Sequence, residues 1–398
     1  MSTPFKLFEA YGVELEYMIV DRDSLAVRPI ADQVLIEDGE ITSELEDGVV
    51  SWSNELALHV IELKCAQPTP TLEGWGQHFA ESLHRVLDRL APLNATLLGT
   101  GMHPTMDPDT EFSKWPHEAS EIYDAFDRIF DCRGHGWSNL QSMHLNLPFA
   151  DDDELGRLHA AIRVILPVLP ALCASSPIYG GRRQPSLDAR LEVYKYNAKR
   201  VPEVSGQVIP EPAFTAAEYD AQVFQPLYRA IAPHDPKGIL QHEWLNARGA
   251  IVRFDRNAIE IRVMDVQEHP VADLAIASTV SAVLKRLVDA DQSTLRAFDS
   301  TRLRKTFDLC VAQADGAVLD DVELCRALGV DTNTPLKARE LWHQLATETN
   351  TMTKPIEVIT TEGTLARRIV DAMDRSSVEE TYRALVDCLK EGRSFSAA

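Results

Sequence analysis

The chain has 398 residues, of which 45% are hydrophobic and 25% are charged, and it carries a net charge of −22. This composition is typical of a soluble globular protein that is large enough to hold one large domain or two. The strong negative charge argues against a nucleic acid or an anionic membrane as the partner. It does not exclude a small anionic substrate, because bound metal ions and a few arginines can reverse the local field.

Nothing in the sequence indicates export or membrane insertion. Residues 1–6 do not form a basic region followed by an apolar run, as a signal peptide would. The longest apolar run, residues 164–174, is interrupted by Pro167 and Pro170 and is too short to span a bilayer. The six cysteines are scattered without a C-x-x-C pair, which is typical of reduced thiols. We therefore expect a cytoplasmic protein that does not bind membranes.

Residues 12–21 are predicted to form the first strand. Side chains on a strand alternate between its two faces, so Glu14 and Glu16 share one face and the apolar residues around them share the other. Two neighbouring carboxylates repel each other unless a cation lies between them. Oxygen ligands suit Mg²⁺ or Mn²⁺, so we expect a divalent metal ion here. The alternative is an exposed strand face with two solvated glutamates.

Residues 36–51 are predicted to form a loop with at most one short strand. Two more glutamates lie in the following stretch, residues 53–64, which is rich in strand-favouring residues. Glu55 and Glu62 are seven residues apart, so an unbroken strand would send them to opposite faces. Both can reach one site only if Glu55 precedes the strand or a bulge intervenes. Glu62, between two apolar residues, is the better candidate ligand.

Residues 141–148 alternate cleanly between polar and apolar side chains. Ser142, His144 and Asn146 share the polar face. A single imidazole on such a face suits a metal ligand or a nucleotide contact. An ordinary histidine on a half-exposed strand is the alternative.

A basic segment follows in this acidic chain. The loop of residues 174–183 contains Ser175, Ser176 and Arg182, and Arg190 continues the basic cluster. Hydroxyls, glycines and guanidinium groups are the chemistry expected around phosphate or carboxylate groups. A solvated basic patch is the alternative.

Residues 251–265 read as two strands joined by a turn. Glu260 and Arg262 share one face of the second strand, and Arg253 precedes the turn. A carboxylate for a metal ion beside guanidinium groups for an anionic reactant is the combination that phosphoryl transfer needs.

The remaining segments are predicted to be mostly helical. The first helix starts at Thr69-Pro70, the second covers residues 116–133 with an apolar stripe of Ile122, Phe126, Ile129 and Phe130, and the third covers residues 151–173 with a distortion at its prolines. Four further helices follow residue 270, over residues 271–290, 300–314, 335–350 and 363–391. The chain contains neither a dinucleotide fingerprint nor a phosphate-binding P-loop.

An antiparallel sheet that gathers the four polar strand faces would form an acidic concave face able to hold several divalent ions. The fold class predicted is therefore α+β. Several Mg²⁺ ions suit ATP chemistry, in which metal ions bridge phosphate oxygens.

The ordered set of motifs resembles the glutamate–cysteine ligase type 2 family of ATP-dependent carboxylate–amine ligases. The matching segments run from about residue 10 to residue 270 and are Gly12–Glu16, Glu55–Glu62, Gly101–Pro104, Gln141–Asn146, Ser175–Pro177 and Arg253–Arg262. The resemblance implies a glutamine-synthetase-like antiparallel sheet with helices behind it, a catalytic core over residues 1–270, and a helical part over residues 271–398 packed on the same unit.

The resemblance also implies a reaction and a set of site residues. An acyl phosphate forms on the γ-carboxylate of glutamate and an amine then attacks it, with cysteine among the candidate amines and glutathione biosynthesis as the expected context. The cofactors implied are ATP and Mg²⁺, with Mn²⁺ as an alternative ion. The implied ligands of the metal ions are Glu14, Glu16, Glu55, Glu62, His144 and Glu260. Arg190, Arg253 and Arg262 would act on substrate or phosphate, and His144, Ser175, Ser176 and Arg182 would contact the nucleotide.

Two other functions remain open at this point. The same sheet could phosphorylate an amine or guanidinium, or the protein could be a sensor that binds Mg-ATP or an amino acid without turnover. The expected partners are small molecules and not nucleic acids or membranes, and a homo-oligomer is left open.

Overall fold

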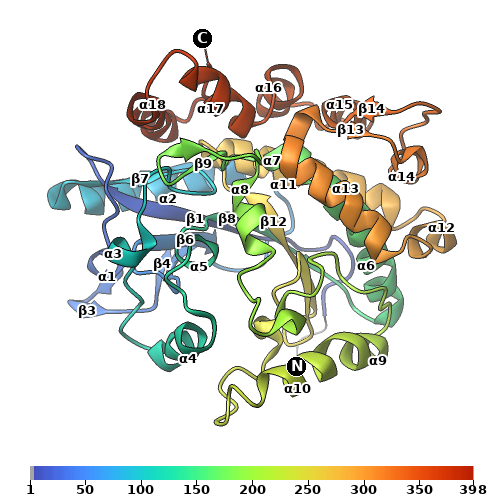
Figure 1. Ribbon diagram of the computed structural model, residues 1–398, viewed down its shortest axis with the longest axis horizontal. Coiled ribbons are helices and arrows are strands. Elements are labelled where there is room, and N and C mark those ends of the chain that lie inside the picture. The colour runs from blue at the N-terminus through green and yellow to red at the C-terminus, as the bar shows by residue number, and fades with distance from the viewer. Residues whose placement is uncertain (1–3, 398) are drawn as a thin grey trace.

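A computed structural model describes residues 4–397 and contains a central antiparallel sheet of eight strands (Figure 1). The strand order is β11-β12-β8-β1-β6-β5-β4, and β7 also pairs with β1. The strands are β1 (Gly12–Asp21), β4 (Glu44–Asp47), β5 (Val50–Asn54), β6 (Val60–Cys65), β7 (Ala95–Leu98), β8 (Ser142–Pro148), β11 (Ala250–Arg253) and β12 (Ala258–Asp265).

Strand β1 is the centre of this sheet. One of its edges pairs with β6, and the other pairs first with β8 and then with β7. The side chains of Val13, Leu15 and Tyr17 on one face of β1 are fully buried in the main hydrophobic core. The period-two pattern of the sequence therefore decides which face of the sheet is covered and leaves the glutamates on the other.

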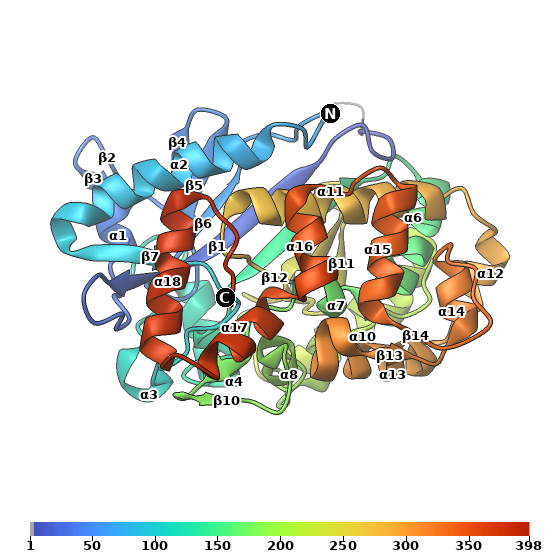
Figure 2. The same ribbon diagram turned by 90° about the horizontal axis from the view of Figure 1, so that it is seen from above.

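Helices cover the apolar face of the sheet. The long helices α2 (Trp75–Leu90) and α11 (Pro270–Leu287) pack against each other, and α2 also contacts β5 and β6. Figure 2 shows α11, α16, α17 and α18 on the side that lies above the sheet in Figure 1. The helices α6 (Asp152–Ile165) and α16 (Lys354–Glu362) also pack against α11, α13 (Ser300–Gln313) packs against α7 (Pro170–Cys173), α15 (Ala338–Glu348) packs against α16, and α17 (Leu365–Met373) packs against α18 (Val378–Glu391).

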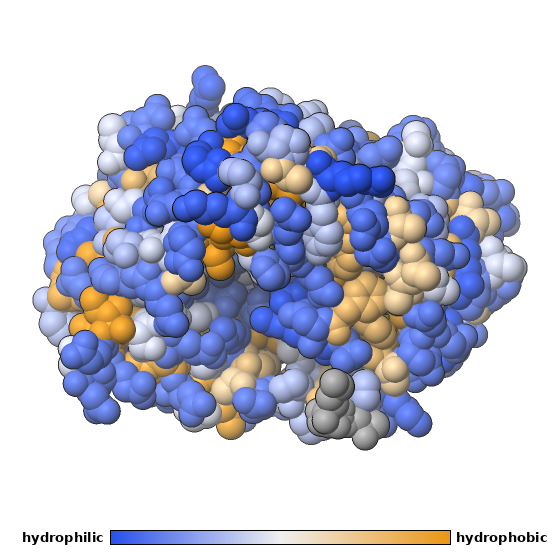
Figure 3. All heavy atoms as spheres, turned by 90° about the horizontal axis from the view of Figure 1, so that it is seen from below, coloured by the Kyte–Doolittle hydropathy of each residue, from blue (hydrophilic) through white to orange (hydrophobic). Residues whose placement is uncertain are grey.

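The opposite side of the sheet is only partly covered. Helices α4 (Ser120–Phe130), α9 (Ala216–Tyr219) and α10 (Gln225–Ile231) lie below the sheet in Figure 1. Figure 3 looks at this side from below and shows a largely hydrophilic surface that is hollowed near its middle. The short helices α5 (His135–Ser138) and α8 (Ala189–Tyr194) also supply residues to the pocket on this side, whereas β9 (Ile178–Tyr179) and β10 (Arg182–Arg183) form a separate two-stranded sheet.

The structure confirms the predicted α+β class, with its antiparallel sheet and helical C-terminal region. The main hydrophobic core contains residues from both sides of residue 270, and the division of the chain there stays a prediction. No helix within residues 4–397 is long and apolar enough to cross a membrane.

Some local predictions were wrong. Residues 36–51 contain the strands β2 (Ile36–Glu37), β3 (Glu40–Ile41) and β4 and the start of β5, and the helix predicted over residues 363–391 is two helices, α17 and α18. Helix α2 begins at Trp75 and not at Thr69-Pro70, because Gly74, with a φ of 79°, has a left-handed backbone directly before the helix.

Candidate metal centre and its two pockets

The register of the sheet brings the predicted acidic residues onto one face. Glu16 lies opposite Glu62 across β1 and β6, and Glu14 lies opposite His144 across β1 and β8. Glu260 lies opposite Asn146 across β12 and β8. Residues directly opposite each other in an antiparallel pair point to the same side of the sheet, so all of these side chains share the open face.

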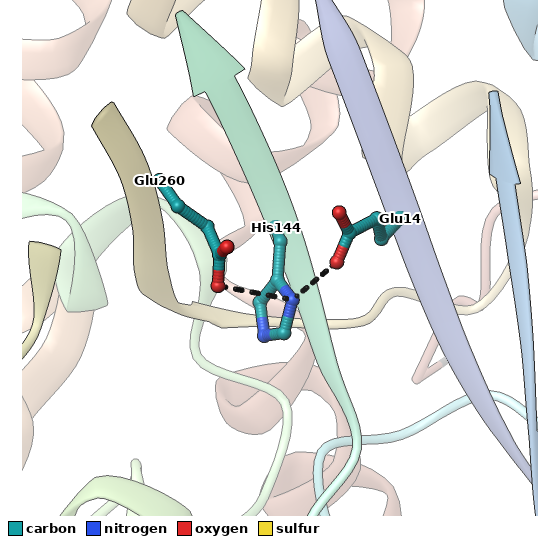
Figure 4. Close-up of side chains that lie close together, drawn as sticks. All are labelled: Glu14, His144 and Glu260. Atoms are coloured by element: carbon teal, nitrogen blue, oxygen red, sulfur yellow. Dashed lines mark hydrogen bonds and ion pairs between the residues drawn. The ribbon is translucent and has the colours of Figure 1, made fainter. Parts of the chain in front are cut away.

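Glu14, His144 and Glu260 form a first group that could hold a metal ion. Their ligand atoms lie within 4.8 Å of one another. His144 Nδ1 lies 2.9 Å from Glu14 Oε2 and 3.9 Å from Glu260 Oε1. Figure 4 shows the three side chains converging from three neighbouring strands. Asn146 Nδ2 donates to the other oxygen of Glu14 at 3.1 Å, which helps to fix that carboxylate.

Glu16, Glu62 and His144 form a second group of the same kind. His144 Nε2 lies 3.8 Å from Glu16 Oε1, so the imidazole stands between the two groups with one nitrogen toward each. Ser142 orients Glu16 through its backbone N–H at 2.6 Å and its hydroxyl at 2.9 Å. Ser53 donates to Glu62 at 2.8 Å. These hydrogen bonds fix the carboxylates in position as the partners of metal ligands usually do.

Three cationic side chains border the carboxylates. Arg262 Nε lies 3.0 Å from Glu260 Oε1, and Arg253 Nη1 lies 3.7 Å from Glu260 Oε2. Lys64 Nζ lies 3.8 Å from Glu62 Oε1. Arg253 is also held by Asp255 at 2.9 Å. The site therefore combines acidic ligands for a cation with basic groups for an anion.

The pKa shifts reveal an excess of buried negative charge. Burial, together with the nearby Glu14 and Glu55, raises the pKa of Glu62 well above its ordinary value. Burial and the neighbouring Glu16 raise the pKa of Glu55 to about 7. Burial alone would raise the pKa of Glu14, but the hydrogen bond and positive charge of His144 outweigh it and lower the pKa to about 2.

His144 compensates part of this charge. Burial lowers its pKa, but the hydrogen bond to Glu14 and the negative charges of Glu16 and Glu14 more than offset this and raise the pKa above its ordinary value. The surrounding carboxylates therefore favour a proton on this imidazole. The donor set of carboxylate oxygens with one imidazole fits Mg²⁺ or Mn²⁺, so the residues present agree with the ions that the sequence predicts.

Two pockets meet at this centre, and Glu55, His144 and Arg262 line both. Glu55 lies in the turn after β5, which is the first of the two ways in which it could reach the site of Glu62. The charged pocket has a volume of about 520 Å³ and is lined by the cations Lys64, Arg253, Arg256 and Arg262 together with Glu14, Glu62 and Glu260. The aromatic pocket has a volume of about 420 Å³ and is lined by Tyr123, Phe126, Trp137, Tyr194 and Trp244 together with Glu16 and Ser142.

Arg190 reaches the aromatic pocket but is neutralised there. Its guanidinium group is 2% exposed and forms a hydrogen-bonded ion pair with Asp265, which is fully buried. Its Nη atoms lie 3.5 Å from the backbone oxygen of Arg262. Asp188 caps helix α8 by accepting from the N–H of Leu191. This geometry supports a positioning role for Arg190, because its charge is already paired.

Three predicted nucleotide contacts are not brought to the pockets. Ser175 and Ser176 are fully buried, and the backbone N–H of Ser175 and the hydroxyl of Ser176 donate to Asp265 at 2.8 and 2.7 Å. Arg182 lies on the exposed strand β10 and lines neither pocket. The hydroxyls are engaged inside the core and Arg182 faces solvent, so the candidate site does not include them.

Sequence reasoning missed the aromatic wall. Ile122 and Phe126 were expected in one apolar stripe with Ile129 and Phe130, but only the latter two are buried, while Ile122 and Phe126 are half-buried and line the pocket. A helical repeat of apolar residues looks the same in sequence whether it faces a core or a cavity. Trp244 lies on a short 3₁₀ turn, where no periodicity could have marked it.

Comparisons with known proteins agree with this geometry. The family model described as "Glutamate-cysteine ligase family 2" matches residues 10–387. An uncharacterised protein of Archaeoglobus fulgidus is 38% identical over 277 residues, which cover 69% of this chain and 73% of that protein. A putative glutamate–cysteine ligase 2 of Clavibacter sepedonicus is 26% identical over 175 residues, 43% of this chain and 42% of that protein.

A solved structure shows the same fold. The structure of glutamate–cysteine ligase from Francisella tularensis in complex with AMP superposes with a TM-score of 0.65 at 13% identity, over 98% of this chain and 90% of that one. The predicted glutamine-synthetase-like arrangement and the predicted family resemblance are thereby confirmed.

Proposed function

Because the chain belongs to glutamate–cysteine ligase family 2, we propose that it is an ATP- and Mg²⁺-dependent ligase that joins a carboxylate to an amine. The leading candidate for the carboxylate is the γ-carboxylate of glutamate. The observation that carries this proposal is the placement of the acidic centre at the meeting point of two different pockets. Such a centre can bring the γ-phosphate of a nucleotide from one side against a carboxylate from the other.

The two groups of ligands would hold the metal ions. Glu14, His144 and Glu260 would bind one ion, and Glu16 and Glu62 would bind a second, with Glu55 at the junction. When bound, the ions would neutralise the phosphate oxygens of ATP. His144 would lose its proton on metal binding, because only the neutral imidazole offers a lone pair.

The charged pocket is the side that suits the nucleotide. Lys64, Arg253, Arg256 and Arg262 line it, and a triphosphate needs cations along its length. Arg262, which lines both pockets, would lie beside the transferring phosphoryl group and stabilise its charge. Arg253 is the second guanidinium group on this side, held in place by Asp255.

The proposed reaction has two steps. An oxygen of the substrate carboxylate attacks the γ-phosphorus, the bond to the leaving oxygen of ADP breaks, and an acyl phosphate forms. The nitrogen of the amine then attacks the carbonyl carbon, the bond to the phosphate oxygen breaks, and the amide and inorganic phosphate are released. The proton lost from the amine passes to solvent. The chain contributes orientation and charge, and no covalent bond to the protein is needed.

ADP release tests this proposal. Purified protein with Mg-ATP and glutamate is screened against each natural amino acid and common amines, with Glu16→Gln as the inactive variant. We expect one class of acceptor to raise ADP release and give a new amide by mass spectrometry. A stable phosphorylated acceptor in place of the amide would show a phosphotransferase, and Mg-ATP binding without turnover of any acceptor would favour a sensor.

A further inference from the structure

The wall of the aromatic pocket is built from three segments that are far apart in the sequence. Helix α4 supplies Phe126, helix α5 supplies Trp137, and the turn before β11 supplies Trp244. The ring centroids of Phe126 lie 5.4 Å from Trp137 and 5.9 Å from Trp244. All three side chains are half-buried, so each presents part of its ring to the cavity. Partly exposed aromatic rings that converge on a cavity are typical of a binding site for an apolar group.

The opposite end of the same pocket is acidic. Glu16 and Glu55 line it beside Ser142 and His144. The two guanidinium groups of this pocket are already paired, Arg190 with Asp265 and Arg262 with Glu260. An ammonium group is therefore favoured at the acidic end, and an apolar group is favoured against the rings. One molecule that carries both is an amine with a bulky apolar substituent.

The nucleotide does not compete for this pocket in the proposed reaction. Its phosphates need the cations of the charged pocket, and only the γ-phosphate has to reach the junction. The rest of the nucleotide then extends away from the aromatic rings. The aromatic pocket is left for the molecules that react with the γ-phosphate from the other side.

We propose that the amine substrate carries a large apolar group, preferably an aromatic ring, which packs against the wall formed by Phe126, Trp137 and Trp244. This inference rests on the proposed ligase function and names the class of its acceptor. A small side chain such as that of alanine or cysteine would leave most of the ring surface exposed to water. An aromatic side chain would cover it, and each aromatic ring carries a large area of apolar surface.

Acceptor preference in the ligase assay tests the inference. With Mg-ATP and glutamate, kcat/KM is measured for alanine, cysteine, leucine, phenylalanine, tryptophan and benzylamine. We expect the aromatic amines to exceed alanine and cysteine by at least about tenfold, the discrimination that a few methylene groups of apolar contact provide. In Trp244→Ala the ratio of phenylalanine to alanine should fall by about tenfold, and Trp244→Phe should restore part of it. Tyr196, which is 61% exposed and lines neither pocket, provides the control variant Tyr196→Ala.

An assay with hydroxylamine as the acceptor distinguishes a failure of this inference from a failure of the proposed ligase function. Hydroxylamine is small enough to trap an acyl phosphate without using the aromatic wall, so hydroxamate formation reports carboxylate activation alone. Hydroxamate together with a preference for alanine or cysteine overturns the inference and leaves the ligase function standing. Absence of hydroxamate with every carboxylate tried argues against the ligase function.

If no hydroxamate forms, the direct binding of amines to the protein still tests the aromatic site. Isothermal titration of the full chain with benzylamine and with methylamine, in the presence of Mg²⁺ and ADP, needs no turnover. Saturable binding of benzylamine that is weakened in Trp244→Ala supports the aromatic site. Equal binding of the two amines, or no binding of either, overturns it.

Discussion

Glu16 and Glu62 lie directly opposite each other across β1 and β6 and project from the same face of the sheet. Two like charges at such a position normally destabilise a sheet. The side chains are also 8–10% exposed, so water screens their repulsion poorly. A metal ion between them would turn this repulsion into attraction, which explains why a stable fold retains the pair.

The first prediction follows from this pair. Glu62→Gln removes one of the two charges and should raise the free energy of unfolding of the metal-free protein by roughly 0.2–1 kcal/mol. The same change should weaken Mg²⁺ or Mn²⁺ binding at least about tenfold, because a ligand is lost. Thermal unfolding with and without Mg²⁺ measures both effects. The exposed Glu46, on neighbouring β4, gives the control Glu46→Gln, which should change neither.

A different result would point away from a metal centre. Stabilisation by Mg²⁺ that is equal in the original chain and in Glu62→Gln would mean that the ion binds elsewhere. The carboxylates would then be held by His144, Lys64 and their hydrogen bonds to Ser142 and Ser53 without a metal ion.

Arg262 and Arg182 give opposite expectations for activity. Arg262 lies 3.0 Å from Glu260 and lines both pockets, so Arg262→Gln should lower kcat for ADP release by about 10²–10³-fold through the loss of charge stabilisation. Arg182 is exposed on β10, so Arg182→Gln should leave kcat and the KM for ATP within about twofold of the original values. Steady-state kinetics of the two variants checks the pair. A raised KM for ATP in Arg182→Gln would restore the role that the sequence predicts for this residue.

The Arg190–Asp265 pair is predicted to be structural. Both side chains are almost completely buried, so Asp265→Asn leaves a guanidinium group without its charge partner and should cost about 3–5 kcal/mol in the free energy of unfolding. Urea denaturation measures this cost. Glu348 forms an ion pair with Arg286 in which both side chains are more than 40% exposed, so Glu348→Gln should cost less than about 1 kcal/mol. Similar losses in the two variants would contradict the assignment.

Stability should fall as the pH is lowered from about 6.5 toward 4. Burial lowers the pKa of His59 to about 4, although its hydrogen bond to the backbone of Ser138 opposes the shift. Burial likewise lowers the pKa of His103 to about 4. The unfolded chain, with a histidine pKa near 6.5, binds more protons than the folded chain in this window, so the folded state loses stability as the pH falls.

The contribution of His59 to this loss is about 3 kcal/mol at pH 4 relative to pH 7. His59→Gln keeps a donor for the carbonyl of Ser138 but no longer titrates, so its stability should depend less steeply on pH across the same window. Urea denaturation at pH 4.5 and pH 7 measures the difference. Parallel pH profiles for the two proteins would show that the fold does not lower the pKa of His59.

Local patterns were enough to predict the acidic face of the sheet. Glu14 and Glu16 on β1, and Ser142 and His144 on β8, lie on one face because the period of a strand is two and is set by the backbone alone. The same reasoning placed Glu260 and Arg262 together on β12. The ordered motifs also indicated the family, because each marks a separate strand or turn of the same sheet.

The position of Glu55 was a question that spacing could not answer. The odd separation of Glu55 from Glu62 was compatible with either a bulge or a turn. The pairing of β5 with β6 places Glu55 in a turn between these strands. Register depends on contacts between segments, which a single stretch of sequence does not contain.

The sequence by itself determined which residues are candidates for metal and phosphate binding, since this follows from residue type and local alternation. The tertiary structure alone decided which of them reach the site. Ser175 and Ser176 have suitable hydroxyls, but the fold turns these inward to Asp265. Phe126 and Trp244 have apolar aromatic side chains like those of core residues, but in the fold they line a cavity. Burial is a property of how distant segments pack together, so no local pattern separates a core face from the wall of a pocket.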